Sequence, residues 1–199
     1  LIVSDEIHSD LIFHGKKHIP TATLSPEIAA HVITCISGTK TFNLAGLQAS
    51  AVVFPNADLK ARFDKFWFNL DIHRNNAFSS VAVETAFNEG EEWLEQMLGY
   101  VEGNIDFTEN YLKEHVPGIS MIRPQASYLI FLDCRALGLS QEELVRLFTE
   151  KAHLALNDGA MFGKPGEGFM RLNVGCPRSV LQTALRQLSA AVKEEKARI

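Results

Sequence analysis

The sequence lacks several features that mark particular classes of protein. No apolar run approaches the about 20 residues that cross a bilayer. Cysteine is scarce, and Cys35, Cys134 and Cys176 are too few and too scattered for a disulfide framework. Basic residues number 19 against 24 acidic ones, the opposite of the balance that non-specific nucleic-acid binding needs. These absences favour a reduced, cytoplasmic protein with neither nucleic-acid nor membrane partners.

The composition that remains is that of a globular protein. Apolar residues make up 46% of the 199 residues and charged residues 22%, which excludes a disordered chain. The chain opens on Leu1-Ile2-Val3-Ser4, a run typical of a buried strand. A buried strand needs neighbours on both sides, so we expect the chain to be the C-terminal part of a longer polypeptide. The alternative is a small domain whose first strand lies at a sheet edge.

The first part of the chain, residues 1–88, predicts an α/β arrangement. Apolar β-branched runs alternate with amphipathic segments, as in a mainly parallel sheet with helices packed outside it. We expect the run Ala49–Phe54 to be the antiparallel strand of that sheet. The expected strands are 1–4, 32–36 and 49–54, and the expected helices are 27–31, 56–70 and 77–87. Trp67 and the phenylalanines around it are either core or subunit interface.

The second part, residues 89–199, predicts a separate small α+β domain. It begins with a long amphipathic helix from Glu91 to His115, which Pro117 and Gly118 end. Ser140 and Glu143 have the spacing of a capping box at the start of another helix. The other expected elements are strands near 120–123, 128–133, 154–156 and 169–174, and a last helix from about residue 178.

Four separated features carry the candidate chemistry. Asp5 ends the first strand, Ser37 and Thr39 precede Lys40 after the second, and Arg171 begins a late strand. Each alone has an ordinary explanation, as a turn acid, a surface lysine or a surface ion pair of little energetic value. Taken together they lie where ligands bind in open α/β sheets, at strand ends and in the loops that follow.

The combination matches the needs of pyridoxal phosphate (PLP) chemistry. A lysine amine must bind the cofactor's aldehyde as an imine. A carboxylate must keep the pyridine nitrogen protonated so that the ring can accept electrons. Hydroxyl groups suit the phosphate, and a fork-shaped guanidinium suits the carboxylate of an amino-acid substrate. Asp5, Lys40, the pair Ser37 and Thr39, and Arg171 supply these groups.

Three stretches resemble the fold-type I PLP enzymes, the aspartate aminotransferase superfamily. Within it the chain is most similar to the C-terminal half of the aminotransferase-like cystathionine β-lyase, or carbon–sulfur lyase, branch. The resemblance covers essentially the whole chain. The stretches are Ser4-Asp5-Glu6-Ile7-His8-Ser9-Asp10-Leu11, Ser37-Gly38-Thr39-Lys40-Thr41-Phe42-Asn43-Leu44-Ala45-Gly46-Leu47 and Arg171-Leu172-Asn173-Val174-Gly175-Cys176-Pro177-Arg178.

The resemblance implies a role for each candidate residue. Asp5 pairs with the pyridine nitrogen. Lys40 binds the cofactor covalently and later moves the Cα proton as general base. Ser37 and Thr39 lie near the phosphate, with Ser37 the stronger candidate. Arg171 binds the substrate carboxylate.

Two positions depart from the aminotransferase pattern. His8 stands where aspartate aminotransferases have a tyrosine that bonds the cofactor's phenolic oxygen, so its role at the cofactor is open. Gln48 stands where they carry a phosphate-binding arginine. Arg178 is the second candidate for the substrate carboxylate. The family's glycine-rich phosphate loop, ring-stacking aromatic residue and phenolic-oxygen asparagine are not in this chain, so it does not form a complete site alone.

The resemblance implies an enzyme of amino-acid metabolism that works as a homodimer when full length. We favour a β-lyase that releases a thiol, pyruvate and ammonia from an S-substituted amino acid over an aminotransferase. The alternative from another class is a non-catalytic half, or a relative with a regulatory role. His8, His14, His18 and His31 invite a metal site, but no second cluster of ligands completes one, and we expect none.

Overall fold

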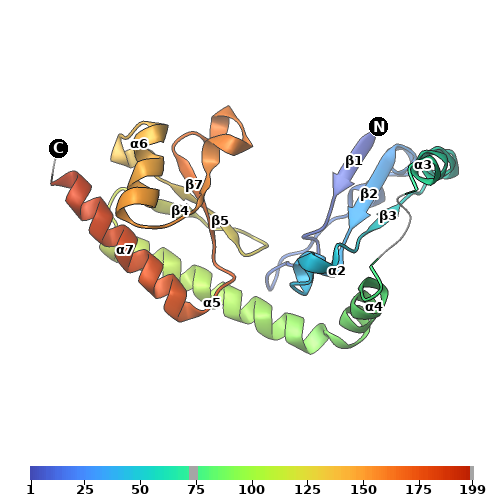
Figure 1. Ribbon diagram of the computed structural model, residues 1–199, viewed down its shortest axis with the longest axis horizontal. Helices are drawn as coiled ribbons and strands as arrows, with labels where there is room; N and C mark the ends of the chain where they lie inside the picture. The colour runs from blue at the N-terminus through green and yellow to red at the C-terminus, as the bar shows by residue number, and fades with distance from the viewer. Residues whose placement is uncertain (72–75, 198–199) are drawn as a thin grey trace. The chain divides into compact units, whose positions relative to one another are not determined.

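The computed structural model describes residues 1–71 and 76–197. The chain forms two compact units, Leu1–Leu98 (unit 1) and Gly99–Ile199 (unit 2), each of which is described by itself (Figure 1). The division falls inside the long helix α5 (Glu91–His115). The expected domain boundary near residue 88 therefore stays a prediction for the whole protein. Among the described helices, none is long and apolar enough to cross a membrane.

Unit 1 contains a three-stranded sheet in the order β1-β2-β3. β1 (Ile2–Asp5) and β2 (Val32–Ile36) are parallel, and β3 (Ala51–Val53) is antiparallel to β2, as expected for the run around residues 49–54. Because a parallel pair needs a crossover, the chain between β1 and β2 is long. That crossover contains the short helices η1 (Thr21–Thr23) and α1 (Pro26–Ala29).

β1 is not a buried strand in this structure, which corrects the expectation. Leu1, Ile2 and Val3 are 77%, 43% and 64% exposed. The reason is the position of β1 at the edge of the sheet, where it pairs with β2 alone. Burial in unit 1 instead centres on Val32 of β2 and on Leu11 and Phe13 in the crossover.

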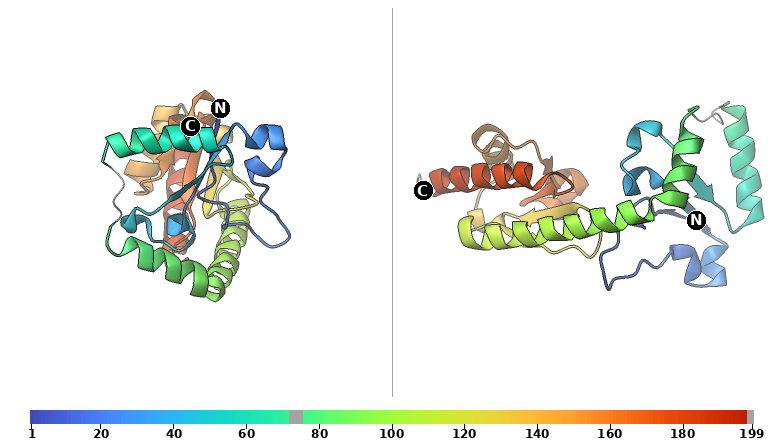
Figure 2. Two further views of the ribbon diagram at one scale, coloured as in Figure 1. Left: turned by 90° about the vertical axis from the view of Figure 1, so that its right-hand side faces the viewer. Right: turned by 90° about the horizontal axis from the view of Figure 1, so that it is seen from below.

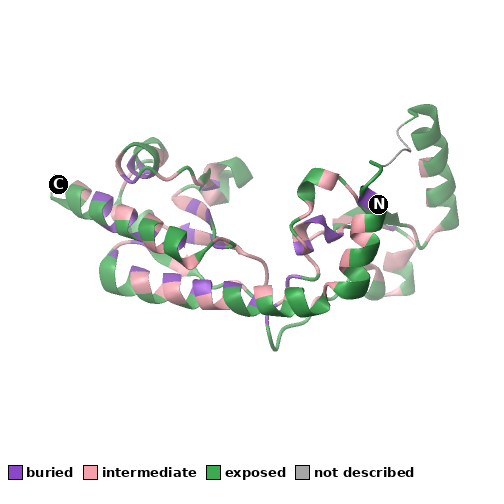
Figure 3. Ribbon diagram, turned by 60° about the horizontal axis from the view of Figure 1, so that its bottom comes forward, coloured by how far each residue is buried: buried purple, intermediate pink, exposed green. Residues whose placement is uncertain are grey.

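The remaining helices of unit 1 are short or peripheral. They are α2 (Gly38–Thr41), η2 (Ala45–Leu47), α3 (Ala57–Asn69) and α4 (Ser79–Glu89). The Asn56 side chain caps α3, but no residue of α3 is buried (Figure 3). Trp67 stacks on Phe63 with ring centres 5.2 Å apart and remains 37% exposed. The core interpretation of this aromatic group is therefore wrong for the described structure.

Unit 2 is an α+β unit built on a four-stranded antiparallel sheet in the order β4-β5-β7-β6. Its strands are β4 (Ser120–Ile122), β5 (Leu129–Asp133), β6 (Asn157–Asp158) and β7 (Phe169–Asn173). α7 (Arg178–Lys196) runs beside the C-terminal part of α5 along one face of this sheet (Figures 1 and 2). A hydrogen bond of 2.9 Å from the Ser189 hydroxyl to the His115 carbonyl joins the two helices.

Two local predictions in unit 2 have different outcomes. The capping box of Ser140 and Glu143 is present at the start of α6 (Gln141–Arg146). The strand expected near 154–156 is wrong, because the strand that forms is β6 at Asn157–Asp158. The amide of Leu154 instead donates to the carbonyl of Phe148, which ties this segment to the π-helical turn Leu147–Lys151 before it.

Burial makes Cys134 an unreactive thiol. Cys134 is 2% exposed, and burial, aided by the charge of Asp133, raises its pKa to about 12 from the usual 9.0. Because the thiolate is the reactive form, we expect alkylation of Cys134 at pH 8 to be about a thousandfold slower in the native protein than in denaturant. Mass spectrometry of the Cys134 peptide after timed iodoacetamide treatment measures this. Equal rates in native and denatured protein would contradict the buried position.

Candidate active site

The ends of β1 and β2 bring Asp5 and Lys40 to the same edge of the sheet. Asp5 is the last residue of β1 and pairs with Cys35 of β2. β2 ends at Ile36, and Lys40 lies one turn further on, in α2. The carboxyl ends of parallel strands meet at one edge, so the aspartate and the lysine belong to one site in unit 1. The Asp5 side chain is exposed and Lys40 is half-buried.

A buried hydrogen bond joins the turn after Asp5 to the helix that carries Lys40. The Thr41 hydroxyl donates to Asp10 at 2.8 Å, and Thr41 is fully buried. Leu11, also fully buried, fixes the same turn. This link, between residues far apart in sequence, fixes the β1 end relative to α2 and so restricts the geometry of the Asp5–Lys40 site.

Ser37 and Thr39 form a polar turn at the start of α2. The Ser37 side chain caps the helix by accepting from the Thr39 amide, and it donates to the Ala49 carbonyl at 2.6 Å. The two hydroxyl oxygens are 2.7 Å apart. The Ser37 proton is thus engaged, and a phosphate role for either hydroxyl requires that one of these bonds be exchanged. That role stays a prediction.

The segment after Lys40 contains two strained backbone positions. Asn43 and Gln48 have φ of 56° and 52°, in the left-handed region that costs a non-glycine residue about 1–3 kcal/mol. Gln48 ends η2 in this conformation. Strain of this kind persists where the surrounding structure enforces it, and it is common at functional sites. Gln48 is the residue that departs from the phosphate-binding arginine of the aminotransferases.

His8 lies in the turn that follows β1 and is half-buried. Its carbonyl accepts from the amide of Leu11 at 3.0 Å, so it helps to form the turn. A role of its side chain at the cofactor stays a prediction. Among the described residues, no group of three or more histidine, cysteine, aspartate or glutamate side chains is placed to hold a metal ion.

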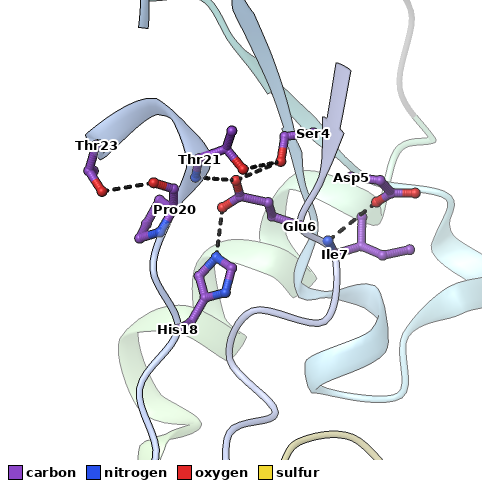
Figure 4. Close-up of polar contacts among 8 residues, drawn as sticks. All are labelled: Ser4, Asp5, Glu6, Ile7, His18, Pro20, Thr21 and Thr23. Carbon is purple, nitrogen blue, oxygen red and sulfur yellow. Dashed lines mark hydrogen bonds and ion pairs between the residues drawn. The ribbon is translucent and has the colours of Figure 1, made fainter. Parts of the chain in front are cut away.

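Glu6 is a polar residue of this site that sequence reasoning missed. It is only 7% exposed, and its carboxylate accepts from the Ser4 hydroxyl at 2.9 Å, the Thr21 amide at 3.0 Å and His18 Nε2 at 2.8 Å (Figure 4). The Ser4 and Thr21 hydroxyls are also 2.8 Å apart. The available signal was strand alternation, which places Ser4 and Glu6 on one face and Asp5 on the other.

The environment of Glu6 predicts a pH-dependent stability. Burial alone raises the pKa of Glu6, but hydrogen bonds from His18, Thr21 and Ser4 outweigh it, and the net pKa lies below 4.5. A lowered folded-state pKa adds stability that is present above pH 4.5 and lost as the pH falls through the folded-state value. We therefore expect Glu6→Gln to destabilise the full-length protein at pH 7 and to do so much less near pH 3.

Urea unfolding at a series of pH values measures this difference. The matched control is Glu27→Gln, which neutralises an exposed glutamate in α1 of the same unit. A difference between wild type and Glu6→Gln that does not change with pH would show that the Glu6 charge contributes nothing.

Arg171 lies in unit 2, on β7 opposite Asn157 of β6. Its Nη2 donates to the Asn157 side-chain oxygen at 2.9 Å, and its guanidinium lies 4.5 Å from the centre of the Phe162 ring. Its Nε is buried without a hydrogen-bond partner among the described residues. A buried unpaired donor costs about 1–3 kcal/mol, so this guanidinium is held in place yet still lacks an acceptor.

Arg178, the second candidate, is occupied in the structure of unit 2. Its Nε donates to Asn104 at 2.7 Å, its guanidinium lies 4.7 Å from the centre of the Phe107 ring, and its amide donates to the Tyr100 hydroxyl. Asn104 is itself fully buried and bonds the carbonyls of Val174 and Cys176. These contacts join α7 to α5, which leaves Arg171 as the better candidate for a ligand.

Comparisons with known proteins agree with this arrangement. The chain is 44% identical to cystathionine β-lyase PatB of Bacillus subtilis over 96% of its own length. A PLP-bound protein from Clostridium difficile 630, described there as a provisional aminotransferase, is 47% identical over 96% of the chain, with a TM-score of 0.93. Cystalysin from Treponema denticola, crystallised with a pyridoxal 5′-phosphate cofactor, also gives a TM-score of 0.93 at 30% identity over 96% of the chain.

The chain spans about half the length of these relatives, since it covers 49% of each. Its two units have the same α/β fold as the corresponding half of those PLP-dependent structures. The sequence profile of the family described as aminotransferase class I and II matches residues 1–188. With so long a match and a 44% identical relative, this chain belongs to the aminotransferase class I and II family.

Proposed function

We propose that the whole protein is a PLP-dependent carbon–sulfur β-lyase of the cystathionine β-lyase type. It takes an S-substituted amino acid and water and releases a thiol, pyruvate and ammonia. The observation that carries the proposal is the meeting of Asp5 and Lys40 at one sheet edge, in a chain 44% identical to a cystathionine β-lyase. The supporting electrostatic feature is the buried, unpaired Nε of Arg171.

When bound, the cofactor supplies an electron-accepting ring. Asp5 keeps the pyridine nitrogen protonated, because a nearby carboxylate stabilises the cationic ring nitrogen. Lys40 holds the cofactor covalently and removes the substrate's Cα proton with its Nζ. Loss of that proton permits the bond between Cβ and sulfur to break, and the thiolate leaves with the bonding electrons.

Arg171 binds and orients the substrate carboxylate through its fork of N–H donors. Asn157 and Phe162 hold the guanidinium for that task. Ser37 and Thr39 lie near the cofactor phosphate, and His8 near its ring. We assign residues 1–88 to the cofactor-binding large domain and residues 89–199 to the small domain, in a cytoplasmic homodimer.

The direct test incubates the full-length PLP-loaded protein with cystathionine and no 2-oxo acid. We expect homocysteine and pyruvate to appear in equal amounts, because elimination consumes water and needs no amino-group acceptor. If the C–S bond stays intact and 2-oxoglutarate is converted to glutamate, the protein is an aminotransferase. If neither reaction occurs although PLP is bound, the non-catalytic alternative is correct.

The aminotransferase is the second candidate because the provisional name of the 47% identical Clostridium difficile protein favours it. Both reactions begin when Lys40 removes the Cα proton. They differ in where that proton goes next, which the position of the Lys40 amine decides. Transfer of the proton to the cofactor gives transamination, whereas loss of the Cβ substituent gives elimination.

A further inference from the structure

Asp5 and Glu6 leave the end of β1 on opposite faces of the sheet. Ser4 and Glu6 share one face, because their side chains are hydrogen-bonded to each other at 2.9 Å. Asp5 points away from that pair (Figure 4). The Glu6 amide donates to the Cys35 carbonyl at 2.8 Å and continues the β1–β2 ladder by one residue. The peptide that joins Asp5 to Glu6 is therefore fixed on the Glu6 side.

The Asp5 side chain itself is weakly held. It is exposed, and its Oδ1 accepts a long bond of 3.4 Å from the amide of Ile7. Glu6, in contrast, accepts three bonds of 2.8–3.0 Å from three segments: β1, the chain before η1, and η1 itself. Because the peptide unit is planar and stiff, anchoring Glu6 also restricts the direction in which Asp5 points.

The group that faces Glu6 with a titratable charge is His18, whose ring is part-exposed. The Ser4 hydroxyl from β1 and the Thr21 amide from η1 complete the set of donors. On the same face of β2, opposite Ser4, Thr34 has a buried hydroxyl oxygen with no hydrogen-bond partner among the described residues. The anchor therefore depends on an ionised Glu6, since all three donors need an acceptor.

We propose that Glu6 is a positioning residue for Asp5: by anchoring the end of β1, it holds the Asp5 carboxylate where the cofactor's pyridine nitrogen binds. His18 is its main partner in this anchor. The inference rests on the proposed function, because it assumes that Asp5 meets that nitrogen. It goes beyond that function by assigning a role to a residue on the opposite face of the sheet from the cofactor.

A double-mutant cycle in the full-length protein tests the proposal. Apo-protein is titrated with PLP, and the visible absorbance of the bound cofactor gives the dissociation constant. We expect Glu6→Gln to weaken PLP binding about tenfold, the worth of a hydrogen bond to a charged group. In an Asp5→Asn background, which loses the partner of the nitrogen, the same change should cost under about twofold, because coupled residues are not additive.

Glu27→Gln serves as the control, and it should leave PLP binding unchanged in both backgrounds. Visible circular dichroism of the bound cofactor should change in Glu6→Gln, because a displaced Asp5 alters the cofactor's orientation. His18→Gln, which keeps an N–H donor, should preserve PLP binding better than His18→Ala. If Glu6→Gln fails to fold, the cycle is run with His18→Ala, for which we expect about a threefold effect that vanishes with Asp5→Asn.

Two results would overturn the inference, and they are distinguishable. Equal losses from Glu6→Gln with and without Asp5 would show that Glu6 supports the fold alone, and the proposed function would stand. Unchanged PLP affinity and absorbance in Asp5→Asn by itself would remove the role of Asp5, and with it both the proposed site and its positioning residue.

Discussion

Replacing Lys40 with alanine in the full-length protein is expected to abolish the visible absorbance of bound PLP and to reduce turnover by several orders of magnitude. The amine has two tasks in the proposed site, covalent capture of the cofactor and transfer of the Cα proton. Proton transfer by a positioned side chain alone contributes about 10²- to 10⁴-fold to a rate. Absorbance spectra and initial rates of pyruvate release from cystathionine measure both losses.

The matched control for that change is Lys65→Ala, which removes an exposed lysine from α3 in the same unit. It should alter neither the absorbance nor the rate. Lys40→Arg keeps the charge but cannot form the imine, so we expect it to behave like Lys40→Ala. Near-normal turnover in either Lys40 variant would show that the site has been assigned to the wrong lysine.

Replacing Arg171 with alanine is expected to raise the apparent KM for amino-acid substrates at least about 30-fold, while the cofactor absorbance stays normal. Removing one partner of a hydrogen-bonded charge pair costs about 2–5 kcal/mol, and 2 kcal/mol corresponds to about 30-fold in affinity. Titration of the PLP-loaded protein with L-alanine, which has no leaving group at Cβ, separates binding from elimination. Arg171→Lys should recover only part of the affinity, because an ammonium group lacks the guanidinium fork.

Two further variants sharpen the result for Arg171. Asn157→Ala removes the hydrogen bond that orients the guanidinium, so we expect a smaller rise in KM in the same direction. Arg146→Ala removes an exposed arginine of α6 that pairs with Glu142, and it should change nothing. An unchanged affinity for L-alanine in Arg171→Ala would reduce Arg171 to a structural residue of the unit 2 sheet.

Elements with strong local signals could be predicted from the sequence. α5 begins and ends at the expected residues because an acidic first turn and the Pro117-Gly118 stop are both local. The capping box of Ser140 and Glu143 and the strand β2 are local in the same sense. The strand near residues 154–156 could not be placed, because the pairing that selects Asn157 depends on its partner Arg171, which lies on a distant part of the chain.

The site shows the same division between local and distant information. Asp5, Lys40 and Arg171 could be selected because their residue types match a chemistry and their sequence contexts match a family. The contacts that position them could not, since they join residues distant in sequence: Thr41 with Asp10, Asn157 with Arg171, and Glu6 with His18. Glu6 was overlooked because a carboxylate beside a candidate aspartate resembles an ordinary turn residue until its burial is known.

The measurement that tests the central claim most directly is the site of covalent PLP attachment. The full-length protein is loaded with PLP, reduced with borohydride to fix the imine, digested and examined by mass spectrometry. The assignment of Lys40 predicts that the phosphopyridoxyl group is found on the peptide that contains Lys40, and that Lys40→Ala protein carries no such group. Attachment at another lysine, or no attachment in protein that is correctly folded, would contradict the account.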